Sequence, residues 1–283
     1  MSAGAPTASA VGLHMLNRPG YTGQLNEAVM TRVEYIAAEL GLPHLAEEKF
    51  SHLRDTHQSW RTAGGGDGDD LAAYIDHTVL KADVSDAAIE QLCAEAREHG
   101  FRAVCVNGCH VARCAQLLAG SAVRVATVCG FPLGQMTSAM KAAEAAEEIV
   151  NGAHEVDMVM NVGALKSKRY RDVFTDVKGV CDVCARASAV SKVILETCLL
   201  SDEEIIDACI VCVAAGATFV KTSTGFSTTG ATPEAVDIML AVVGNQAEVK
   251  ASGGVRDRST ALQYVRAGVR RIGTSSGIAI VSL

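Results

Sequence analysis

A lysine at the end of a short apolar strand is the residue of this chain best placed for covalent chemistry. Residues 218–225 predict a strand that ends at Lys221, followed by a polar turn in which Thr222 and Gly225 are candidate substrate-binding residues. A partly buried lysine loses hydration, so its pKa falls and the neutral amine can attack a carbonyl to form a Schiff base. Taken alone, Lys221 is better explained as an ordinary strand-end lysine that extends to water, and the rest of the chain reverses this preference.

Two more charged residues interrupt apolar runs. Asp157 lies in the run 155–161, where it shares a strand face with Asn161, and Lys250 lies in the run 247–251. Charges are costly to bury without a partner, so we expect them to meet Lys221 inside one closed sheet. Lys250 would lower the pKa of Lys221 by repulsion, and Asp157 could relay protons through a water molecule. The alternative is an ion-pair network that only fixes strand register, but a second lysine favours catalysis.

Two glycine-rich segments, 252–256 and 273–277, follow the last two predicted strands. Glycines let backbone N–H groups approach an anion, and a short final helix would add donors. Either segment alone would be an ordinary turn, but the pair predicts a phosphate site. The predicted phosphate-binding residues are Gly253, Gly254, Val255, Arg256, Gly273, Ser275 and Ser276.

Strand-like and helix-like segments alternate after residue 70 and must position these residues. The strand-like runs are 71–75, 101–106, 123–128, 155–161, 192–196, 218–221, 247–251 and 270–273. The helix-like segments are 85–99, 110–118, 138–151, 170–188, 202–214, 233–243 and 259–267. Serine caps and helix-ending glycines mark their boundaries at Ser85, Ser201, Gly100, Gly152, Gly216 and Gly268.

This alternation predicts an α/β fold, a (β/α)8 TIM barrel, in which catalytic residues lie at the carboxyl ends of the strands and phosphate at the loops after strands seven and eight. A doubly wound open sheet is the alternative. No G-x-G-x-x-G motif follows the first strand, which argues against the open sheet.

Composition restricts the function further. The chain has 283 residues, 49% of them hydrophobic, and a net charge of −7, which argues against a nucleic-acid-binding surface. No apolar run reaches transmembrane length, and residues 1–11 do not resemble a signal peptide, so we expect a cytoplasmic protein without membrane contact. The ten cysteines are then expected to be reduced. The two C-x-x-C pairs at 181–184 and 209–212 lie in helix-like segments, where buried thiols are favoured over structural zinc.

Residues 1–70 form a predicted N-terminal extension before the barrel of residues 71–283. Residues 1 to about 22 lack periodicity and are expected to be disordered, 25–40 and 45–60 predict two helices, and 64–70 form a flexible Gly/Asp linker. His52 and His57 match no metal-ligand spacing, so we expect them on the surface. Nothing in the sequence decides the oligomeric state, and a homodimer is one alternative.

Six segments together resemble deoxyribose-phosphate aldolase over residues 71 to about 280: Asp76-His-Thr78, Gly130-Phe-Pro-Leu-Gly134, Glu155-Val-Asp157, Lys221-Thr-Ser-Thr-Gly225, Lys250-Ala-Ser-Gly-Gly-Val-Arg256 and Gly273-Thr-Ser-Ser276. The resemblance implies a class I aldolase, without metal or cofactor, that interconverts 2-deoxy-D-ribose 5-phosphate with acetaldehyde and D-glyceraldehyde 3-phosphate. Lys221 matches the Schiff-base lysine, and Asp157 and Lys250 match the proton-relay pair. Asp76, Thr78 and Cys105 match residues that face the substrate.

Two features depart from this family. The sequence ends at Leu283, whereas many members carry a tail ending in a tyrosine that assists proton transfer, so the family's chemistry is expected but not its rate. Phe226 stands where some members have a lysine, which removes one charge from the phosphate site. Two alternatives stay open: a catalytically weak barrel that serves as a partner-binding scaffold, and a Schiff-base aldolase for another phosphorylated sugar.

Overall fold

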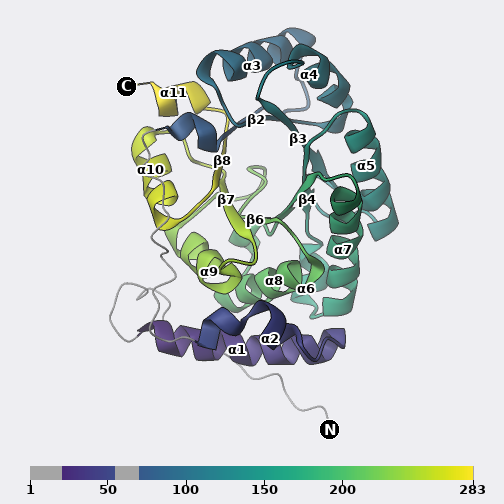
Figure 1. Ribbon diagram of the computed structural model, residues 1–283, viewed down its shortest axis with the longest axis vertical. Helices are drawn as coiled ribbons and strands as arrows, with labels where there is room; N and C mark the ends of the chain where they lie inside the picture. The colour runs from purple at the N-terminus through teal and green to yellow at the C-terminus, as the bar shows by residue number, and fades with distance from the viewer. Residues whose placement is uncertain (1–20, 55–69, 283) are drawn as a thin grey trace.

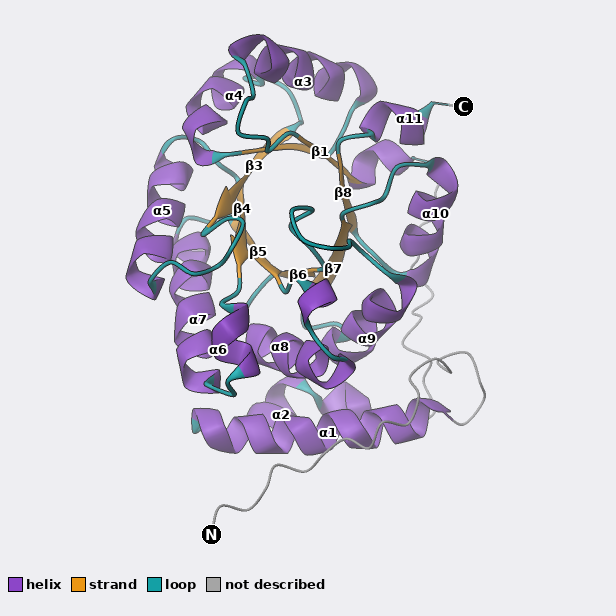
Figure 2. Ribbon diagram, turned by 180° about the vertical axis from the view of Figure 1, so that it is seen from behind, coloured by secondary structure: helices purple, strands orange, loops and turns teal. Residues whose placement is uncertain are grey.

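Eight parallel strands form a closed barrel in which each strand pairs with the next in the sequence and β8 returns to β1 (Figures 1 and 2). The computed structural model describes residues 21–54 and 70–282. The strands are β1 (Ile75–Thr78), β2 (Ala103–Val106), β3 (Arg124–Cys129), β4 (Glu155–Val159), β5 (Val190–Ile194), β6 (Phe219–Lys221), β7 (Glu248–Ser252) and β8 (Arg271–Thr274). The (β/α)8 prediction is confirmed, and the open doubly wound sheet is excluded.

The helices lie outside the barrel and connect successive strands (Figure 2). They are α3 (Asp86–His99), α4 (Val111–Leu117), α5 (Ser138–Val150), α6 (Val162–Lys166), α7 (Tyr170–Arg186), α8 (Asp202–Ala215), α9 (Pro233–Val243), α10 (Arg258–Ala267) and α11 (Gly277–Val281). Short 3-10 turns are η3 (Leu71–Tyr74), η4 (Gly108–His110) and η5 (Thr197–Leu199). None of the helices in the described part of the chain is both long and apolar enough to cross a bilayer.

Local sequence explains where the helices begin and end. Ser201 and Glu204 form a reciprocal capping box at the start of α8, which satisfies two backbone N–H groups that the helix leaves free. Gly216 ends the same helix in the left-handed conformation, with φ 82°, which a residue with a Cβ adopts only at a cost. Ser85 and Gly100 do the same for α3. The predicted caps are therefore confirmed.

Strand boundaries were predicted less well than strand order. The segment predicted as the first strand, 71–75, is mostly the 3-10 turn η3, and β1 follows it. An apolar run of five residues cannot distinguish a strand from a helical turn, and pairing with both neighbours decides the matter. Asp76 of β1 lies opposite Ala103 of β2 and Gly273 of β8, which sets the register on both sides.

The fourth and fifth strands also differ from the prediction. β4 ends before Asn161, whose side chain accepts a hydrogen bond from Ala164 N at 3.0 Å and begins the unpredicted helix α6, so Asn161 does not continue the Asp157 face. β5 begins two residues before the predicted start and ends before Glu196, which has a left-handed backbone with φ 56°. Pairing of Glu155 with Val190 sets this earlier start.

The N-terminal helix α1 (Tyr21–Leu40) packs on the outside of the barrel against α7 and α8 (Figure 1). Its apolar face, with Val29, Val33 and Ile36 fully buried, joins the hydrophobic core of the barrel. Arg32 in the same interface donates to Asp207 of α8 at 2.8 and 2.6 Å. This contact explains why α8 is apolar around its whole circumference: one side faces the barrel and the other faces α1.

The second predicted helix, 45–60, is wrong as a continuous element. Helix α2 (Leu45–Lys49) ends before Phe50, and the 3-10 turn η2 (Ser51–Arg54) follows. Phe50 and Leu53 are buried, so packing against the core ends the helix early. The proposed disordered start, the glycine-rich linker and His57 lie outside the described residues, and the boundary at residue 70 stays a prediction.

His52 was predicted at the surface and instead packs against the end of α9. A Cβ at Gly244 would lie 2.5 Å from His52 Nε2, which shows how closely the ring approaches the backbone there. Burial lowers the pKa of His52, and contacts with the backbone of Val242 and Ala241 oppose that effect. The ring is therefore part of the interface between the extension and the barrel.

The four cysteines of the C-x-x-C pairs are buried thiols on α7 and α8: Cys181, Cys184, Cys209 and Cys212. Burial raises the pKa of all four, Cys184 to about 12, so they are protonated at neutral pH. This confirms their interpretation as small buried helix residues.

Candidate active site

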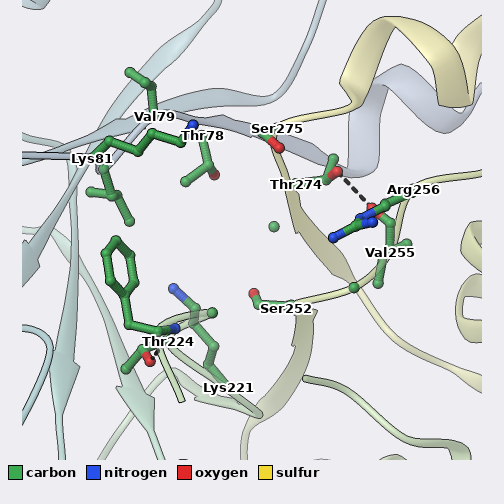
Figure 3. A pocket seen from close by; sticks show the side chains of 16 residues that line it. Thr78, Val79, Lys81, Lys221, Thr224, Ser252, Val255, Arg256, Thr274 and Ser275 are labelled. Carbon is green, nitrogen blue, oxygen red and sulfur yellow. Dashed lines mark hydrogen bonds between the residues drawn. The ribbon is translucent and has the colours of Figure 1, made fainter. Parts of the chain in front are cut away.

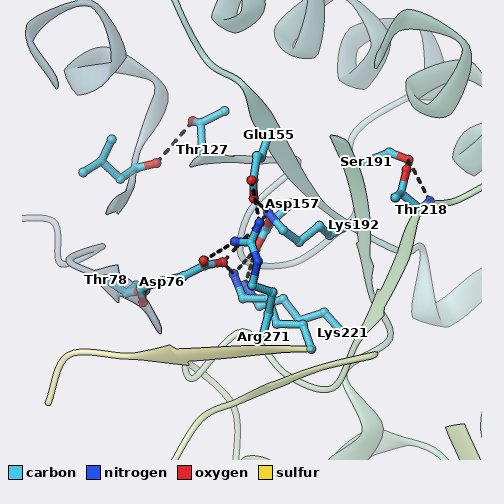
Figure 4. Close-up of polar contacts among 12 residues, drawn as sticks. Asp76, Thr78, Thr127, Glu155, Asp157, Ser191, Lys192, Thr218, Lys221 and Arg271 are labelled. Carbon is cyan, nitrogen blue, oxygen red and sulfur yellow. Dashed lines mark hydrogen bonds and ion pairs between the residues drawn. The ribbon is translucent and has the colours of Figure 1, made fainter. Parts of the chain in front are cut away.

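Asp157 on β4 binds three lysine side chains inside the barrel (Figure 4). Its Oδ2 accepts hydrogen bonds from Lys221 Nζ and Lys250 Nζ, both at 2.8 Å, and its Oδ1 accepts one from Lys192 Nζ at 2.6 Å. Asp157, Lys192 and Lys250 are fully buried, and Lys221 is 3% exposed. The structure thus brings together the three residues that the sequence singled out.

A second set of charges lies directly against the first. Asp76 of β1 accepts hydrogen bonds from Lys250 and from Arg271 of β8. Glu155 of β4 pairs with Arg271 at 2.6 Å and with Lys192 at 2.7 Å. Strand order and period-two alternation explain why these charged side chains lie together, because each of them points into the barrel from its own strand.

The charge balance of this cluster favours a neutral lysine. Four basic residues (Lys192, Lys221, Lys250 and Arg271) face three carboxylates (Asp76, Glu155 and Asp157), so full ionisation would leave one uncompensated positive charge in a buried site. Burial lowers the pKa of Lys221, the carboxylate of Asp157 opposes this, and Lys250 reinforces it. The net effect is a lowered pKa, so Lys221 is the member that gives up its proton most readily.

The other members of the cluster are held in their charged forms. Burial opposes ionisation of Asp76, but Lys250 and Arg271 outweigh it and lower the pKa of Asp76 to about 2. Lys192, Lys221 and Lys250 likewise hold the pKa of Asp157 well below its usual value, despite burial. Burial lowers the pKa of Lys250 less than Asp157 and Asp76 raise it. The pKa values of these two lysines from adjacent strands are therefore shifted in opposite directions: that of Lys221 is lowered and that of Lys250 is raised.

A cavity of about 350 Å³ opens above this cluster at the carboxyl ends of the strands (Figure 3). Of the seven clustered residues, Lys221 is the one that lines it. The other lining residues foreseen from the sequence are Thr78, Gly225, Gly253, Gly254, Val255, Arg256, Gly273 and Ser275. The remaining lining residues, Val79, Leu80, Lys81, Thr224, Phe226, Ser252 and Thr274, were not foreseen.

The glycine-rich loops are closely packed at two positions. Gly253, with φ 81°, lies against Gly230, where a Cβ at Gly253 would come 2.8 Å from the Gly230 Cα. A Cβ at Gly273 would come 2.4 Å from Ser252 Oγ and 3.0 Å from Lys250 Cε. Glycine is therefore required at Gly253 for the β7 loop to lie against Gly230, and at Gly273 for β8 to lie against Ser252 and Lys250, independently of any ligand.

Several predicted site residues do not line the cavity. Asp76, Asp157 and Lys250 lie beneath Lys221, in the cluster. The hydroxyl of Thr222 donates to Ser252 O at 3.0 Å and accepts from Ser252 N at 3.0 Å, so it links β6 to β7. Cys105 lies in a separate buried group on the barrel interior, where burial raises its pKa. The backbone N–H of Ser276 is bonded to the hydroxyl of Thr274 at 2.9 Å.

Three charged members of the cluster, Glu155, Lys192 and Arg271, were not proposed as site residues. A signal for Glu155 existed, because it precedes Asp157 by two positions and must share its strand face. Lys192 and Arg271 are further charges within predicted strands, as Lys250 is. Their pairing partners come from strands far apart in the sequence, which no local pattern reveals.

The chain was then compared with known proteins. The model of the DeoC/LacD family of aldolases matches residues 71–282. A deoxyribose-phosphate aldolase of Brevibacillus brevis is 56% identical over 209 residues, which are 74% of this chain and 94% of that protein. The corresponding enzyme of Carboxydothermus hydrogenoformans is 53% identical over 213 residues, 75% of this chain and 93% of that protein.

Solved structures agree with these relatives. A candidate deoxyribose-phosphate aldolase of Coccidioides immitis is 38% identical with a TM-score of 0.74, and the match covers 94% of this chain and 98% of that one. A tetrameric deoxyribose phosphate aldolase of Aeropyrum pernix is 33% identical with a TM-score of 0.71, covering 78% and 93%. The family match spans the whole barrel and every strand that contributes to the lysine cluster. The chain belongs to the DeoC/LacD family of aldolases.

Proposed function

We propose that the chain is a class I aldolase that cleaves 2-deoxy-D-ribose 5-phosphate to acetaldehyde and D-glyceraldehyde 3-phosphate. The observation that carries the proposal is Lys221, a buried lysine with a lowered pKa that opens into a cavity while Asp157 and the charged Lys250 lie directly behind it. The substrate is supported by the relatives named deoxyribose-phosphate aldolase at 53% and 56% identity.

The neutral amine of Lys221 attacks C1 of the open-chain sugar, and loss of water yields an iminium ion. Removal of the proton from the C3 hydroxyl then breaks the C2–C3 bond, and its electron pair moves into the iminium to form an enamine. D-glyceraldehyde 3-phosphate leaves at this point. Protonation of the enamine at C2 and addition of water release acetaldehyde and regenerate Lys221.

Asp157 and Lys250 are suited to handle the protons of these steps. Asp157 Oδ2 lies 2.8 Å from Nζ of both lysines, so this carboxylate can accept the proton that Lys221 loses, while Lys250 stays protonated as a donor. Lys250 also keeps positive charge next to Lys221, which favours the neutral amine before attack. The proton transfers to and from substrate carbon and oxygen would pass through water in the cavity.

The loops after β7 and β8 would bind the 5-phosphate and so position C1 near Lys221. Gly253, Gly254, Arg256 and Ser275 line the same cavity as Lys221, which supports this assignment. With the phosphate bound there, the distance between the phosphate and the carbonyl carbon of the sugar determines whether that carbonyl reaches the amine of Lys221. This would discriminate against phosphorylated sugars of other lengths.

Borohydride trapping tests the proposal. Incubation with deoxyribose 5-phosphate and borohydride, followed by peptide mass spectrometry, should place one reduced adduct on Lys221. Lys221→Ala should abolish it and keep the fold, because removing this lysine leaves three cations facing three carboxylates. An adduct on Lys250 or Lys81 would contradict the assignment of Lys221.

The scaffold alternative predicts a different result in the same experiment. A barrel retained only for partner binding would give no adduct and no acetaldehyde release from the folded wild-type protein. A Schiff-base aldolase for another sugar would give an adduct with acetaldehyde but not with deoxyribose 5-phosphate. The intact cluster around Asp157 favours the active enzyme over the scaffold.

A further inference from the structure

The charged residues that line the cavity are all basic. Lys81, Lys221 and Arg256 belong to the lining, and no aspartate or glutamate does among the described residues. A cleft that carries charge of one sign concentrates ligands of the opposite sign. Lys221 lies on the floor and is reserved for the carbonyl, so Lys81 and Arg256 are the two cations near the opening.

The order of strands places these two cations on either side of the β8 loop. β8 lies between β7 and β1 in the barrel. Arg256 follows β7, Ser275 follows β8 and Lys81 follows β1, each within a few residues of the strand end. Figure 3 shows the same arrangement, with Ser275 between Lys81 and Arg256 at the edge of the cavity. An anion bound at Ser275 would therefore have a cation on each side.

Within the cavity opening, neither Lys81 nor Arg256 has an acidic partner among the described residues. In the described part of the chain neither residue makes a hydrogen bond or an ion pair, and both side chains are exposed. By contrast, Lys166, Lys178 and Arg113 are each paired with a glutamate or aspartate on the outer surface. Both cavity cations are thus free to bind a ligand without first breaking a pair.

The loop after β6 supplies no cation at the cavity opening. Phe226 lines it there, is 53% exposed, and packs edge-on against Phe131 with ring centroids 5.2 Å apart. An aromatic pair cannot neutralise a dianion, so a second cation must come from another loop. The β1 loop, which carries Lys81, is the one that supplies it.

We propose that Lys81 is the second cation of the phosphate site and binds the 5-phosphate together with Arg256 and the β8 loop. This deepens the proposed function and rests on it for the identity of the phosphorylated ligand. A phosphate monoester carries close to two negative charges at neutral pH, which two cations on opposite sides match. Lys81 would also reach over the cavity opening and hold the sugar against Lys221.

Steady-state cleavage of deoxyribose 5-phosphate and of unphosphorylated deoxyribose tests this role. Lys81→Gln should lower kcat/KM about tenfold on the phosphorylated sugar, mostly through KM, and much less on deoxyribose, as expected for one charge-assisted hydrogen bond. Lys81→Arg should restore most of the loss because it keeps the charge. Lys178→Gln, on the outer face of α7, removes the same charge from the protein and should change neither value.

Binding of inorganic phosphate separates this proposal from the proposed function. Its dissociation constant, from ³¹P titration of the wild-type and Lys81→Gln proteins, should rise at least threefold in the variant, whether or not the enzyme cleaves deoxyribose 5-phosphate. Unchanged phosphate affinity, or equal losses of kcat/KM on both sugars, would overturn the assignment of Lys81. Absence of the Lys221 adduct with normal phosphate binding would instead overturn the function.

Discussion

Lys221 and Lys250 lie opposite each other on adjacent strands and bind the same carboxylate oxygen, Oδ2 of Asp157, at 2.8 Å each. One oxygen thus connects a lysine whose pKa is lowered with one whose pKa is raised. The difference arises because burial outweighs the single carboxylate of Asp157 at Lys221, whereas Lys250 also contacts Asp76, and the two carboxylates together raise its pKa. The arrangement places a lysine that loses its proton more readily beside one that keeps its proton, within the same buried site.

The pH dependence of Schiff-base formation should depend on the net charge of the buried cluster around Asp157. Trapping requires the neutral amine, so its rate rises as pH increases through the pKa of Lys221, which lies below the usual 10.5. Lys192→Met removes the cation that is bonded to Asp157 Oδ1. The negative charge of Asp157 is then less compensated, so it stabilises the ammonium of Lys221 more strongly and raises the pKa of Lys221. We expect the profile to move up by about one pH unit, equivalent to about 1.4 kcal/mol.

The control for that experiment is Lys192→Arg, which keeps the charge and should keep the wild-type profile. Circular dichroism should first establish that Lys192→Met is folded, because breaking a buried pair commonly costs about 3–5 kcal/mol. A profile in folded Lys192→Met that coincides with wild type would show that the charge balance does not control Lys221.

Arg256→Ala should weaken use of the phosphorylated sugar selectively. Loss of one charged hydrogen bond to phosphate is worth about 1.5–3 kcal/mol in kcat/KM. The loss should be far smaller with unphosphorylated deoxyribose, because that sugar has no group for Arg256 to bind. Arg266→Ala, an exposed arginine on α10, is the matched control. Equal losses on both substrates would show that Arg256 acts elsewhere in the reaction.

The N-terminal extension should matter for stability rather than for chemistry. Arg32→Met would leave Asp207 and Tyr170 without their buried cation and should lower the free energy of unfolding by about 3–5 kcal/mol. Trapping at Lys221 should persist in the folded variant, because α1 packs on the outer helices α7 and α8. Arg169→Met, which breaks an exposed pair with Asp172, should cost less than about 1 kcal/mol.

Deletion of residues 1–69 extends the same test. It should expose the apolar outer side of α8 and change the melting temperature or the association state, while a folded product keeps trapping. A folded, monodisperse protein without trapping would place the extension in the active site and contradict this division.

Glu148 on α5 should make stability fall with rising pH. Burial raises its pKa to about 8, and Glu144 adds to the effect, while a hydrogen bond from Thr127 at 3.1 Å opposes it. Between the ordinary glutamate value of 4.5 and about 8, the unfolded chain releases this proton and the folded chain retains it, so unfolding becomes easier as pH rises. Glu148→Gln should therefore be about 1–3 kcal/mol more stable than wild type at pH ~8.5.

Denaturant unfolding at pH ~5 and ~8.5 measures that difference, which should shrink toward the lower pH. Glu98→Gln is the control, because Glu98 is an exposed glutamate on another helix, α3, and does not contribute to the pKa shift of Glu148. Parallel pH curves for wild type and Glu148→Gln would show that the carboxyl does not titrate in this window.

The sequence alone determined the architecture and the position of Lys221, the proposed nucleophile. Strand order, helix caps such as Ser201 and Gly216, and the lysine at the end of β6 follow from local patterns, because caps, turns and period-two alternation act over a few residues. The same patterns placed the glycine-rich loops after β7 and β8. Strand ends were less certain, as Asn161 and the 3-10 turn before β1 show.

Only the tertiary structure decided which charges meet and which lie apart. Lys192, Glu155 and Arg271 complete the cluster because parallel strands from distant parts of the chain close into one ring, and that closure sets the register. The hydroxyl of Thr222, a candidate substrate-binding residue in the sequence, is bonded to the backbone of Ser252 and links β6 to β7. The excess of one cation over the carboxylates, which favours a neutral Lys221, is a property of the closed barrel, because burial and long-range pairing create it together.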